Sequence, residues 1–590
     1  MTSKAQETQK QRGSRQSGKM LWRSGSSLAA AAFLLASAPQ AAQAQGPLRA
    51  PGMMMENAPH GSNVSIRRPE IAESQRFDRA PDFHARNIRI SAPLNPLPVH
   101  NVRISAPAGM VAINEAQAVA PRVDPNRSFQ ANPTSASAFA TVAPTATQDI
   151  VTVFGPETFI NWSPQDSANS DDLINILPAG TTMTFVGPTS GYTVLNRILP
   201  TGTTASGNPR AIAFGGNVTS HLGTSDGPTG GNVWFYSPGG IVVGAGATFD
   251  VGGLVLTTND IDTTGGLVGA GGEIRFRGAA DSLASVTIEN GATINALNNG
   301  SSYVAMVAPR VVQGGTVSVD GSAAYVAAEQ ADLTINNGLF DIAIGVGTTD
   351  VNGVVHSGTT IGPSSTPTSD TFGITDADAQ AIYMVAVPKN DALTMLVSGT
   401  VGYQAAASAQ VVNGHIVLSA GANVATTGDV TNAGFAIDKT AANSDANIQF
   451  QNIAFGSSVS TFATNGISAS TASVTDFIVA NNTVGTQDLL LEARNRIDIN
   501  ALGGGSIRGN GNLTLRAGSD GVGGTININA NQTGFTDAII SGLLVTGDLV
   551  VDARATGLDD FSTVRNNGGT GIGQDAVGGD INITINGGGD

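Results

Sequence analysis

Asn-Val-Trp-Phe-Tyr-Ser-Pro-Gly-Gly-Ile-Val-Val-Gly-Ala-Gly-Ala-Thr-Phe-Asp-Val-Gly-Gly-Leu-Val-Leu-Thr, residues 232–257, is the stretch that decides the fold. Its aromatic and β-branched runs, 233–236, 241–243 and 248–251, predict three short strands. Ser237-Pro238-Gly239-Gly240 predicts a turn, because proline presets φ and glycine supplies positive φ at low cost. Strands this short, each closed by glycines, are typical of a chain that winds into stacked coils.

The composition favours a solenoid built from strands. Glycine accounts for 74 of 590 residues, whereas charged residues make up 13% and aromatic residues 5%. A helical protein would need more Leu, Glu and Lys. We therefore predict an all-β fold, a right-handed parallel β-helix with an N-terminal capping domain. Cysteine is absent, so backbone ladders and stacking would have to stabilise the fold without disulfides.

The net charge is −16, and the acidity is concentrated after residue 149. Residues 150–590 hold 13 basic and 36 acidic side chains, a net charge of −23. Such a surface repels nucleic acid and anionic membranes, so we expect neither as a partner.

Residues 1–44 have the three-part pattern of a secretory signal peptide. Basic residues precede the apolar run 28–36, and Ala42-Gln43-Ala44 fits the small-x-small cleavage pattern. We predict cleavage between Ala44 and Gln45, and Met20 offers a second possible start beside Met1. The apolar run is too short for a membrane anchor, and no transmembrane helix is predicted elsewhere.

Residues 45–149 are rich in proline and weak in apolar periodicity. One segment occurs twice, as Asn-Ile-Arg-Ile-Ser-Ala-Pro at 87–93 and Asn-Val-Arg-Ile-Ser-Ala-Pro at 101–107. The pattern predicts an extended, mostly disordered leader or linker. The alternative is a short linear motif used twice to bind a partner.

From residue 150 the pattern changes to short strands. We expect residues 150–265 to form the first, capping coils, because an exposed first coil would template pairing with other chains. Coils continue through 266–365, an excursion from the rod falls at 366–398, and further coils occupy 399–590. Three aromatic residues are candidates for the core of the cap: Phe154, Phe159 and Trp162.

Two segments predict the length of one coil and the form of the excursion. Tyr303-Val304-Ala305 returns as Tyr325-Val326-Ala327, a spacing of 22 residues. In the excursion, Thr375–Asp378 could cap a short helix, whereas the apolar run 381–387 could equally be a buried strand.

Four motifs follow one another between residues 159 and 255. The first is Phe159-Ile160-Asn161-Trp162, and Thr184-Phe185-Val186-Gly187-Pro188 and Val194-Leu195-Asn196-Arg197-Ile198 follow as a pair. The run 237–247 comes next, and Gly252-Gly253-Leu254-Val255 completes the set. In this order they resemble the secretion domain of filamentous-haemagglutinin-type exoproteins, the passengers of two-partner secretion.

The resemblance implies which residues carry secretion. The candidates are Trp162, Asn196, Arg197, Ser237, Pro238, Gly239 and Gly240. The turn at 237–240 lacks both asparagines of the family pattern Asn-Pro-Asn-Gly and so offers no side-chain amide for recognition. The domain also begins about a hundred residues later than such domains usually do.

The sequence offers little for catalysis or metal binding. The six histidines are far apart, and without cysteine a zinc or redox-metal site is not expected. The close acid pairs, at 171–172, 376/378 and 559–560, suit solvated turns better than a two-carboxylate site. The run 568–575 resembles a calcium nonapeptide but occurs once, whereas that structure needs stacked copies. We predict no enzyme activity, no cofactor and no metal.

The resemblance implies a secreted or surface-exposed exoprotein of a Gram-negative bacterium. Its partner would be an outer-membrane two-partner transporter, and its role would be that of an adhesin, with a receptor or glycan that the sequence does not identify. Two alternatives stay open, namely a β-helical enzyme acting on polysaccharide and a structural protein of a surface layer or matrix.

Overall fold

The computed structural model describes most of the chain beyond residue 123. The described ranges are 124–165, 173–204, 206–298, 302–336, 338–362, 380–403, 414–428, 434–440, 445–471, 478–480, 487–501, 506–509, 512–517, 525–533, 537–543, 549–554, 561–566, 570–571 and 581–586. The chain divides into two units, residues 1–100 and 101–590, and every described residue belongs to the second. The predicted signal peptide, its cleavage site at Ala44 and Gln45, and the duplicated segment lie outside the described residues.

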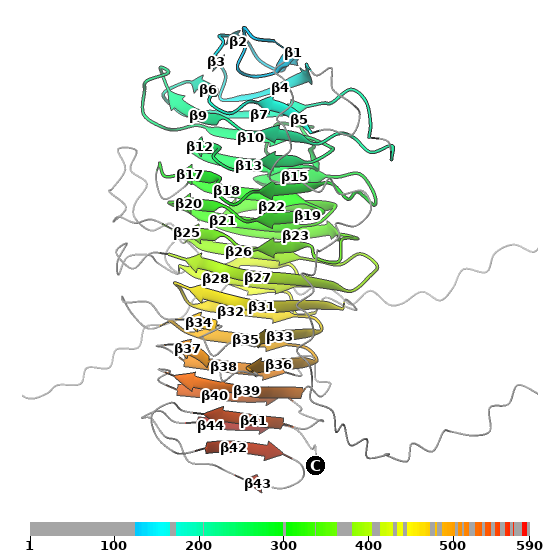
Figure 1. Ribbon diagram of the computed structural model, residues 1–590, viewed down its shortest axis with the longest axis vertical. Coiled ribbons are helices and arrows are strands. Elements are labelled where there is room, and N and C mark those ends of the chain that lie inside the picture. Colours follow the sequence, from blue (N-terminus) through cyan, green and yellow to red (C-terminus); the bar gives the residue numbers. More distant parts are fainter. Residues whose placement is uncertain are drawn as a thin grey trace, which may run out of the picture. The chain divides into compact units, whose positions relative to one another are not determined.

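The strands form three sheets, whose order can be followed in Figure 1. Sheet A contains β1 (Ala131–Ala136), β4 (Glu157–Pro164), β7 (Thr193–Ile198), β10 (Asn232–Tyr236), β13 (Gly253–Thr257), β18 (Tyr303–Ala308), β21 (Ser322–Ala327), β26 (Ala381–Ala386), β28 (His415–Ala420), β32 (Val459–Ala463), β35 (Leu489–Ala493), β38 (Asn512–Ala517), β40 (Asp537–Leu543) and β44 (Ile581–Asn586).

Sheet B wraps around the other two sides of the coils. It contains β2 (Ala140–Ala143), β3 (Gln148–Val153), β5 (Ile174–Leu177), β6 (Thr182–Gly187), β8 (Ile212–Phe214), β9 (Asn217–Leu222), β11 (Ile241–Val243), β12 (Thr248–Asp250), β16 (Ser285–Ile288), β17 (Thr293–Ala296), β19 (Arg310–Gln313), β20 (Thr316–Val319), β24 (Val354–His356), β25 (Thr359–Ile361), β27 (Leu393–Gly402), β31 (Ala446–Phe455), β33 (Gly466–Thr471), β34 (Ile478–Ala480), β36 (Arg496–Ala501), β37 (Ser506–Gly509), β39 (Thr525–Thr533), β41 (Leu549–Arg554), β42 (Phe561–Asn566) and β43 (Thr570–Gly571).

The third sheet, which we call the flank sheet, contains β14 (Asp260–Ile261), β15 (Glu273–Arg277), β22 (Gln330–Asn336), β23 (Leu339–Val346), β29 (Val424–Thr427) and β30 (Gly434–Ile437). Its strands pair antiparallel. They leave the coils after β13, β21 and β28, so the flank sheet is built from insertions at the same corner of successive coils.

Residues 232–257 form one full coil and begin the next. β10 lies in sheet A, β11 and β12 lie on two sides of sheet B, and β13 returns beside β10 with Asn232 opposite Gly253. The predicted strands and the turn at 237–240 are therefore confirmed. Gly252 and Gly253 are required at the return, because a Cβ on Gly252 would lie 2.8 Å from the backbone of Gly231, and one on Gly253 would lie 2.4 Å from the Asn232 side chain.

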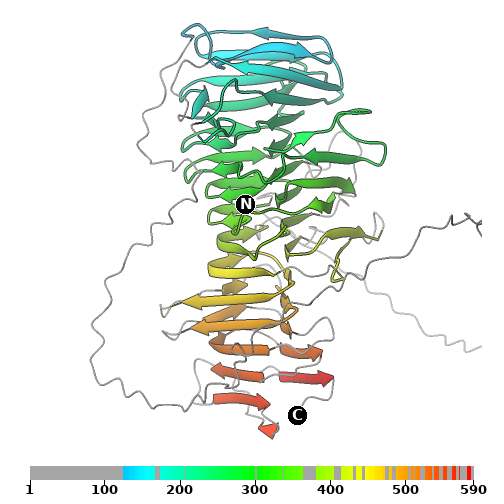
Figure 2. The same ribbon diagram turned by 90° about the vertical axis from the view of Figure 1, so that its right-hand side faces the viewer.

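Parallel pairing continues from coil to coil. In sheet A it runs from β4 to β40, and in sheet B one side follows β5, β8, β11, β16, β19 and β24. We call this side face B1. The described residues contain strands and no helix, and Figures 1 and 2 show the strands stacked in layers. The fold is a parallel β-helix, as the sequence predicts.

The first coil is closed by antiparallel strands, and this cap begins earlier than the sequence predicts. β1 pairs antiparallel with β4, and β2 pairs antiparallel with β3. The predicted boundary at residue 150 is therefore wrong, since strands begin at Ala131. β1 and β2 carry little apolar patterning because most of their residues are exposed. Partner strands hold them in place, and composition alone does not report those partners.

A buried carboxylate organises the cap. Asp149 is fully buried, and it accepts hydrogen bonds from the backbone nitrogen and the hydroxyl of Ser128, both at 2.9 Å. Arg127 lies 3.4 Å from the same carboxylate. Phe129 packs edge-on against Trp162 with ring centroids 5.0 Å apart, so Trp162 belongs to the cap core as predicted. Phe154 does not, because it is 55% exposed.

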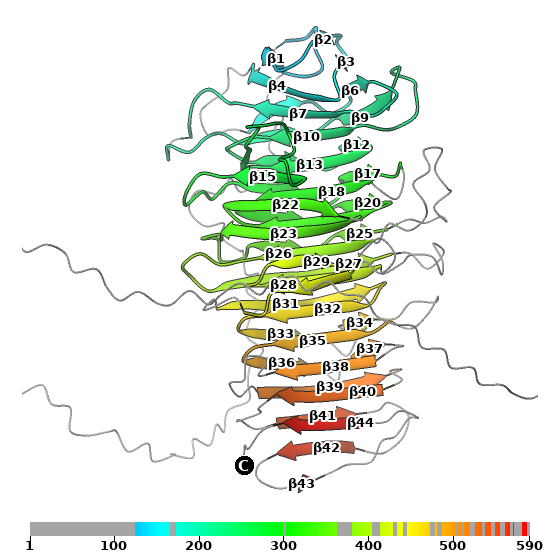
Figure 3. The same cartoon turned by 180° about the vertical axis from the view of Figure 1, so that it is seen from behind.

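A second hydrophobic core lies between sheet A and the flank sheet, which faces the viewer in Figure 3. Trp234 and Tyr303 point into it from sheet A, and Phe276 and Phe340 approach from the flank sheet. β18, β21 and β26 are consequently buried on both faces. This double burial explains their continuous apolar sequences, which do not alternate with polar residues.

The spacing between Tyr303 and Tyr325 does not give the number of residues in one coil. Tyr303 pairs with Ser322, and Tyr325 pairs with Met306, so this side of the coil repeats after 19 residues and not after 22. An offset of three residues also reverses the side of the strand. Tyr303 therefore points into the second core, whereas Tyr325 points into the interior of the coils.

The excursion predicted at 366–398 is only partly consistent with the structure. Residues 381–386 form β26, which pairs with β21 and β28, and β27 begins at Leu393. The second alternative, a buried strand, is confirmed for this run. The possible helix at 375–378 lies outside the described residues. Within the described residues, no helix is long and apolar enough to cross a membrane.

Candidate secretion-motif site

Sheet A brings the motif residues together on three successive coils. β4, β7 and β10 align so that Ile160 lies beside Asn196, which lies beside Phe235. One residue further, Asn161, Arg197 and Tyr236 align in the same way. Residues that are far apart in the sequence therefore become neighbours through the parallel register alone.

Asn196 links the three strands inside the coils. It is fully buried, and its Oδ1 accepts a hydrogen bond from the indole nitrogen of Trp162 at 3.0 Å. Its Nδ2 donates to the carbonyl oxygen of Trp234 at 3.2 Å. A buried amide that uses both of its ends in this way fixes the relative positions of the coils, because losing either bond would leave a buried polar group unsatisfied.

Arg197 acts on the opposite side of the same strand. Its Nε donates to Asp260 at 2.8 Å and its Nη2 to the carbonyl oxygen of Ile261 at 2.5 Å. The guanidinium carbon also lies 5.3 Å from the centroid of the Phe159 ring. Arg197 therefore fastens β14 of the flank sheet to sheet A. Burial, with the nearby charge of Asp260, raises the pKa of Tyr236 to about 12.

The turn at 237–240 packs against the coil before it. Ser237 is buried, its backbone nitrogen donates to Thr257, and Gly240 donates to Ser237 at 3.4 Å. A Cβ on Gly239 would lie 2.2 Å from the carbonyl oxygen of Arg210, and Gly240 has φ +127°. Both glycines are therefore required by packing and by backbone conformation. Pro238 and Gly239 are the half-buried part of the turn.

Sequence reasoning missed the partners of these residues. Asp260 and Ile261 hold Arg197, Tyr303 accepts a hydrogen bond from the Trp234 indole at 2.8 Å, and Asp149 organises the cap. No local pattern marks them, since each contact spans 21 to 69 positions. Among the described residues, no group of three or more His, Cys, Asp or Glu side chains could hold a metal ion.

Comparisons with known proteins give structural neighbours only. No family model matches the chain, and no curated protein matches it. The HMW1 secretion domain from Haemophilus influenzae is similar at 13% identity, with 72% of this chain and 91% of that domain covered and a TM-score of 0.32. The filamentous haemagglutinin secretion domain is similar at 15% identity, with 68% and 99% covered and a TM-score of 0.27. Because both TM-scores are low, we base our proposals on the motifs and geometry of this chain.

Proposed function

We propose that this chain is an exoprotein that a Gram-negative bacterium exports by two-partner secretion. The observation that carries the proposal is that the motif residues Trp162 of β4 and Asn196 of β7 are hydrogen-bonded to each other, and that Asn196 also bonds to Trp234 of β10, just before the turn at 237–240. The outer-membrane transporter would be the partner, and the exported protein would be secreted or held at the cell surface.

The burial of the motif residues limits the time at which a transporter could contact them. Trp162 is 1% exposed, and Asn196 and Ser237 are fully buried. A transporter could contact these side chains only before the first coils fold. The cap closes the first coil, and each later coil adds to the preceding one, so folding outside the cell would proceed in one direction and favour outward movement.

Adhesion is the role we propose for the exported rod, and we propose no catalytic activity. Stacked coils present long, regular faces suited to binding. The close acid pairs considered from the sequence lie outside the described residues, so they support neither role. A polysaccharide-acting enzyme or a matrix protein would differ in releasing reducing sugars or in self-assembling without a receptor.

The test is secretion of the full chain from a Gram-negative host, with and without a two-partner transporter from the same genome. We expect the protein in the medium only when the transporter is present. Retention in the periplasm in both cases, with intact protein, would contradict the proposal.

A matched pair of variants tests the motif itself. Asn196→Leu removes both bonds of the buried amide and should reduce secretion strongly. Asn447→Leu makes the same change outside the motif strands, in β31. There the half-buried amide donates a bond of 3.4 Å to Leu393 and accepts one of 3.0 Å from Asn465, and the change should leave secretion near the level of the unmodified chain. Equal effects of the two would show that the motif strands have no special part in export.

A further inference from the structure

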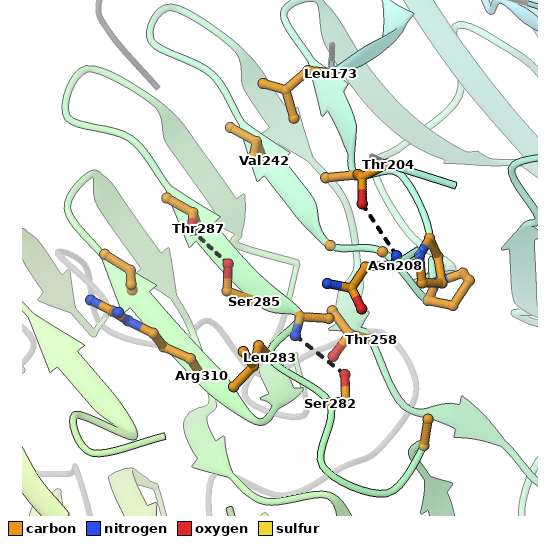
Figure 4. Close-up of a pocket in the computed structure, with 18 of the residues that line it drawn as sticks. Leu173, Thr204, Asn208, Val242, Thr258, Ser282, Leu283, Ser285, Thr287 and Arg310 are labelled. Atoms are coloured by element: carbon orange, nitrogen blue, oxygen red, sulfur yellow. Dashed lines mark hydrogen bonds between the residues drawn. The ribbon is translucent and has the colours of Figure 1, made fainter. Parts of the chain in front are cut away.

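An open cavity of about 490 Å³ lies beside the turn at 237–240, on face B1. Its floor is formed by Tyr236, Pro238 and Gly240 together with the outward-facing side chains of β11, β16 and β19. Its walls are the loops around Asn208 and Ser282, which Figure 4 shows on either side. The volume falls within the range of about 300–1,000 Å³ that is usual for small-molecule sites.

One wall is held by an ionic cluster. Glu329 is almost fully buried. It accepts a hydrogen bond from the backbone nitrogen of Asp281 at 3.0 Å, and its carboxylate forms an ion pair with Lys389 at 2.9 Å. Lys389 also lies 2.9 Å from the Asp281 carboxylate. Asp281 has φ 55°, a conformation that residues other than glycine rarely adopt. The wall is thus fixed by contacts from two other coils.

The opposite wall is fixed by backbone contacts. The bridge between Thr203 and Pro209 closes a narrow loop, and the backbone nitrogen of Thr204 donates to Asn208 at 2.7 Å. The loop then packs on the floor, where Gly239 approaches the carbonyl oxygen of Arg210 too closely for any side chain. The cavity is therefore preformed, because neither wall needs to move to create it.

The lining mixes apolar and polar side chains, and six of the polar ones carry an aliphatic hydroxyl or an amide group. These side chains are Thr204, Asn208, Thr258, Ser282, Ser285 and Thr287. Thr258 is 4% exposed, and its hydroxyl oxygen has no hydrogen-bond partner among the described residues. That oxygen is itself buried, so the hydroxyl and amide groups that a ligand can reach are those of the other lining side chains. Tyr236 adds one aromatic ring with an apolar body and a polar tip.

The charges at the cavity do not favour an anionic ligand. Arg310 lies 3.9 Å from Asp350, and Asp281 is paired with Lys389. Glu289 accepts a hydrogen bond from the backbone nitrogen of Ala245 at 3.0 Å and would repel an anion. The lining side chains can therefore donate hydrogen bonds to a ligand and accept them from it, while they offer little net attraction to a carboxylate or phosphate.

We propose that this cavity binds a short, uncharged oligosaccharide. Such a ligand carries many hydroxyl groups for the polar lining, and a sugar ring has an apolar face that can lie against Tyr236. This binding site is separate from the proposed export function, because a purified chain would bind the sugar whichever route it had taken across the membranes.

The test uses the purified chain without its predicted signal, residues 45–590, and four trisaccharides. Maltotriose, cellotriose and galactotriose are neutral, and trigalacturonate is an acidic relative of the last. Saturation-transfer NMR and calorimetry measure binding. We expect at least one neutral sugar to bind, and galactotriose to bind more tightly than trigalacturonate. Binding of none of the neutral sugars, or tighter binding of the acidic one, would overturn the proposal.

Three variants separate binding from folding. Asn208→Ala removes a lining amide at an exposed position, so it should weaken binding about two- to tenfold without lowering the melting temperature. Thr287→Tyr fills the cavity and should abolish binding. Thr394→Tyr places the same ring on an outward-facing position of β27 outside the cavity, and binding should persist. Binding that survives Thr287→Tyr unchanged would place the sugar elsewhere and refute the assignment.

Discussion

The interior of the β-helix is filled differently in its N-terminal coils and in its middle coils. Between β6 and β12, phenylalanine rings stack along the axis, with the ring centroid of Phe235 4.9 Å from that of Phe214 and 6.0 Å from that of Phe185. Phe249 continues the column, 5.4 Å from Phe214. These contacts are edge-on, the geometry that aromatic pairs favour.

The middle coils, from β19 to β27, enclose a polar network. His356 is fully buried, with Nδ1 2.8 Å from the carbonyl oxygen of Ser398 and Nε2 2.9 Å from the Thr360 hydroxyl. The Tyr325 hydroxyl lies 2.7 Å from the same Thr360 oxygen, and Gln313 donates to it at 3.3 Å. Burial lowers the pKa of His356 to about 4, so the imidazole stays neutral at neutral pH.

The difference shows that the coil backbone tolerates two kinds of interior. The phenylalanine column depends on apolar burial, which does not titrate, whereas the polar network is stable only while its histidine is neutral. Each coil of a solenoid contacts only its neighbours, so the two regions should respond separately to mutation and to pH.

The largest effect should come from Phe235→Ala. Removing a buried phenylalanine typically costs about 3–5 kcal/mol. Trp162 and Trp234 are the two tryptophans beyond the predicted signal, so tryptophan fluorescence during urea unfolding reports on the N-terminal coils. Hydrogen exchange in β26 and β27 should be unchanged. Equal loss of protection there would show that the regions unfold together.

Acid should weaken the middle coils selectively. As the pH falls from about 6.5 to about 4, the unfolded chain binds a proton at His356 that the folded chain excludes. The contribution of neutral His356 to the free energy of unfolding is therefore fully present above the pKa of this histidine in the unfolded chain. It falls by about 3 kcal/mol as the pH decreases from about 6.5 to about 4. Hydrogen exchange between β24 and β27 measures the loss, with tryptophan fluorescence as the comparison.

A variant isolates the histidine from other groups. Burial raises the pKa of Asp320 to about 6, so this carboxyl binds its proton more readily in the folded chain and opposes the loss below that pH. His356→Gln should remove the acid-dependent decrease and leave the opposing contribution of carboxyls such as Asp320 and Asp341, whose pKa values burial raises. An unchanged pH profile in that variant would exclude His356 as the cause.

The smallest effect should come from Arg197→Lys. Lysine keeps the charge but loses the planar fork that reaches both Asp260 and Ile261, at a cost of about 1 kcal/mol. Thermal melting followed by tryptophan fluorescence measures it. Arg275→Lys is the control. Among the described residues, the Arg275 side chain bonds only to residues 262 and 264 of the same insertion and not to sheet A, so its replacement should shift the melting temperature less. A larger shift in the control would mean that the flank sheet does not depend on Arg197.

Local sequence predicts elements better than it predicts contacts. The strands near 233–236 and 241–243 follow from β-branched and aromatic residues between glycines, which act over a few positions. The coil spacing fails at Tyr303 and Tyr325, because the two tyrosines occupy positions three residues apart in successive coils and not equivalent ones. The cap strands before residue 150 were missed, since their pairing partners and not their own side chains define them.

The sequence by itself determines that this chain winds into stacked short strands, because each strand and glycine turn is encoded locally. It also contains the motif residues in their order. Only the tertiary structure decides that Asn196 bridges Trp162 and Trp234, that Arg197 fastens the flank sheet, and that His356 lies among polar partners inside the coils. The reason is physical: these contacts depend on the register between coils, which parallel pairing and packing set over tens of residues.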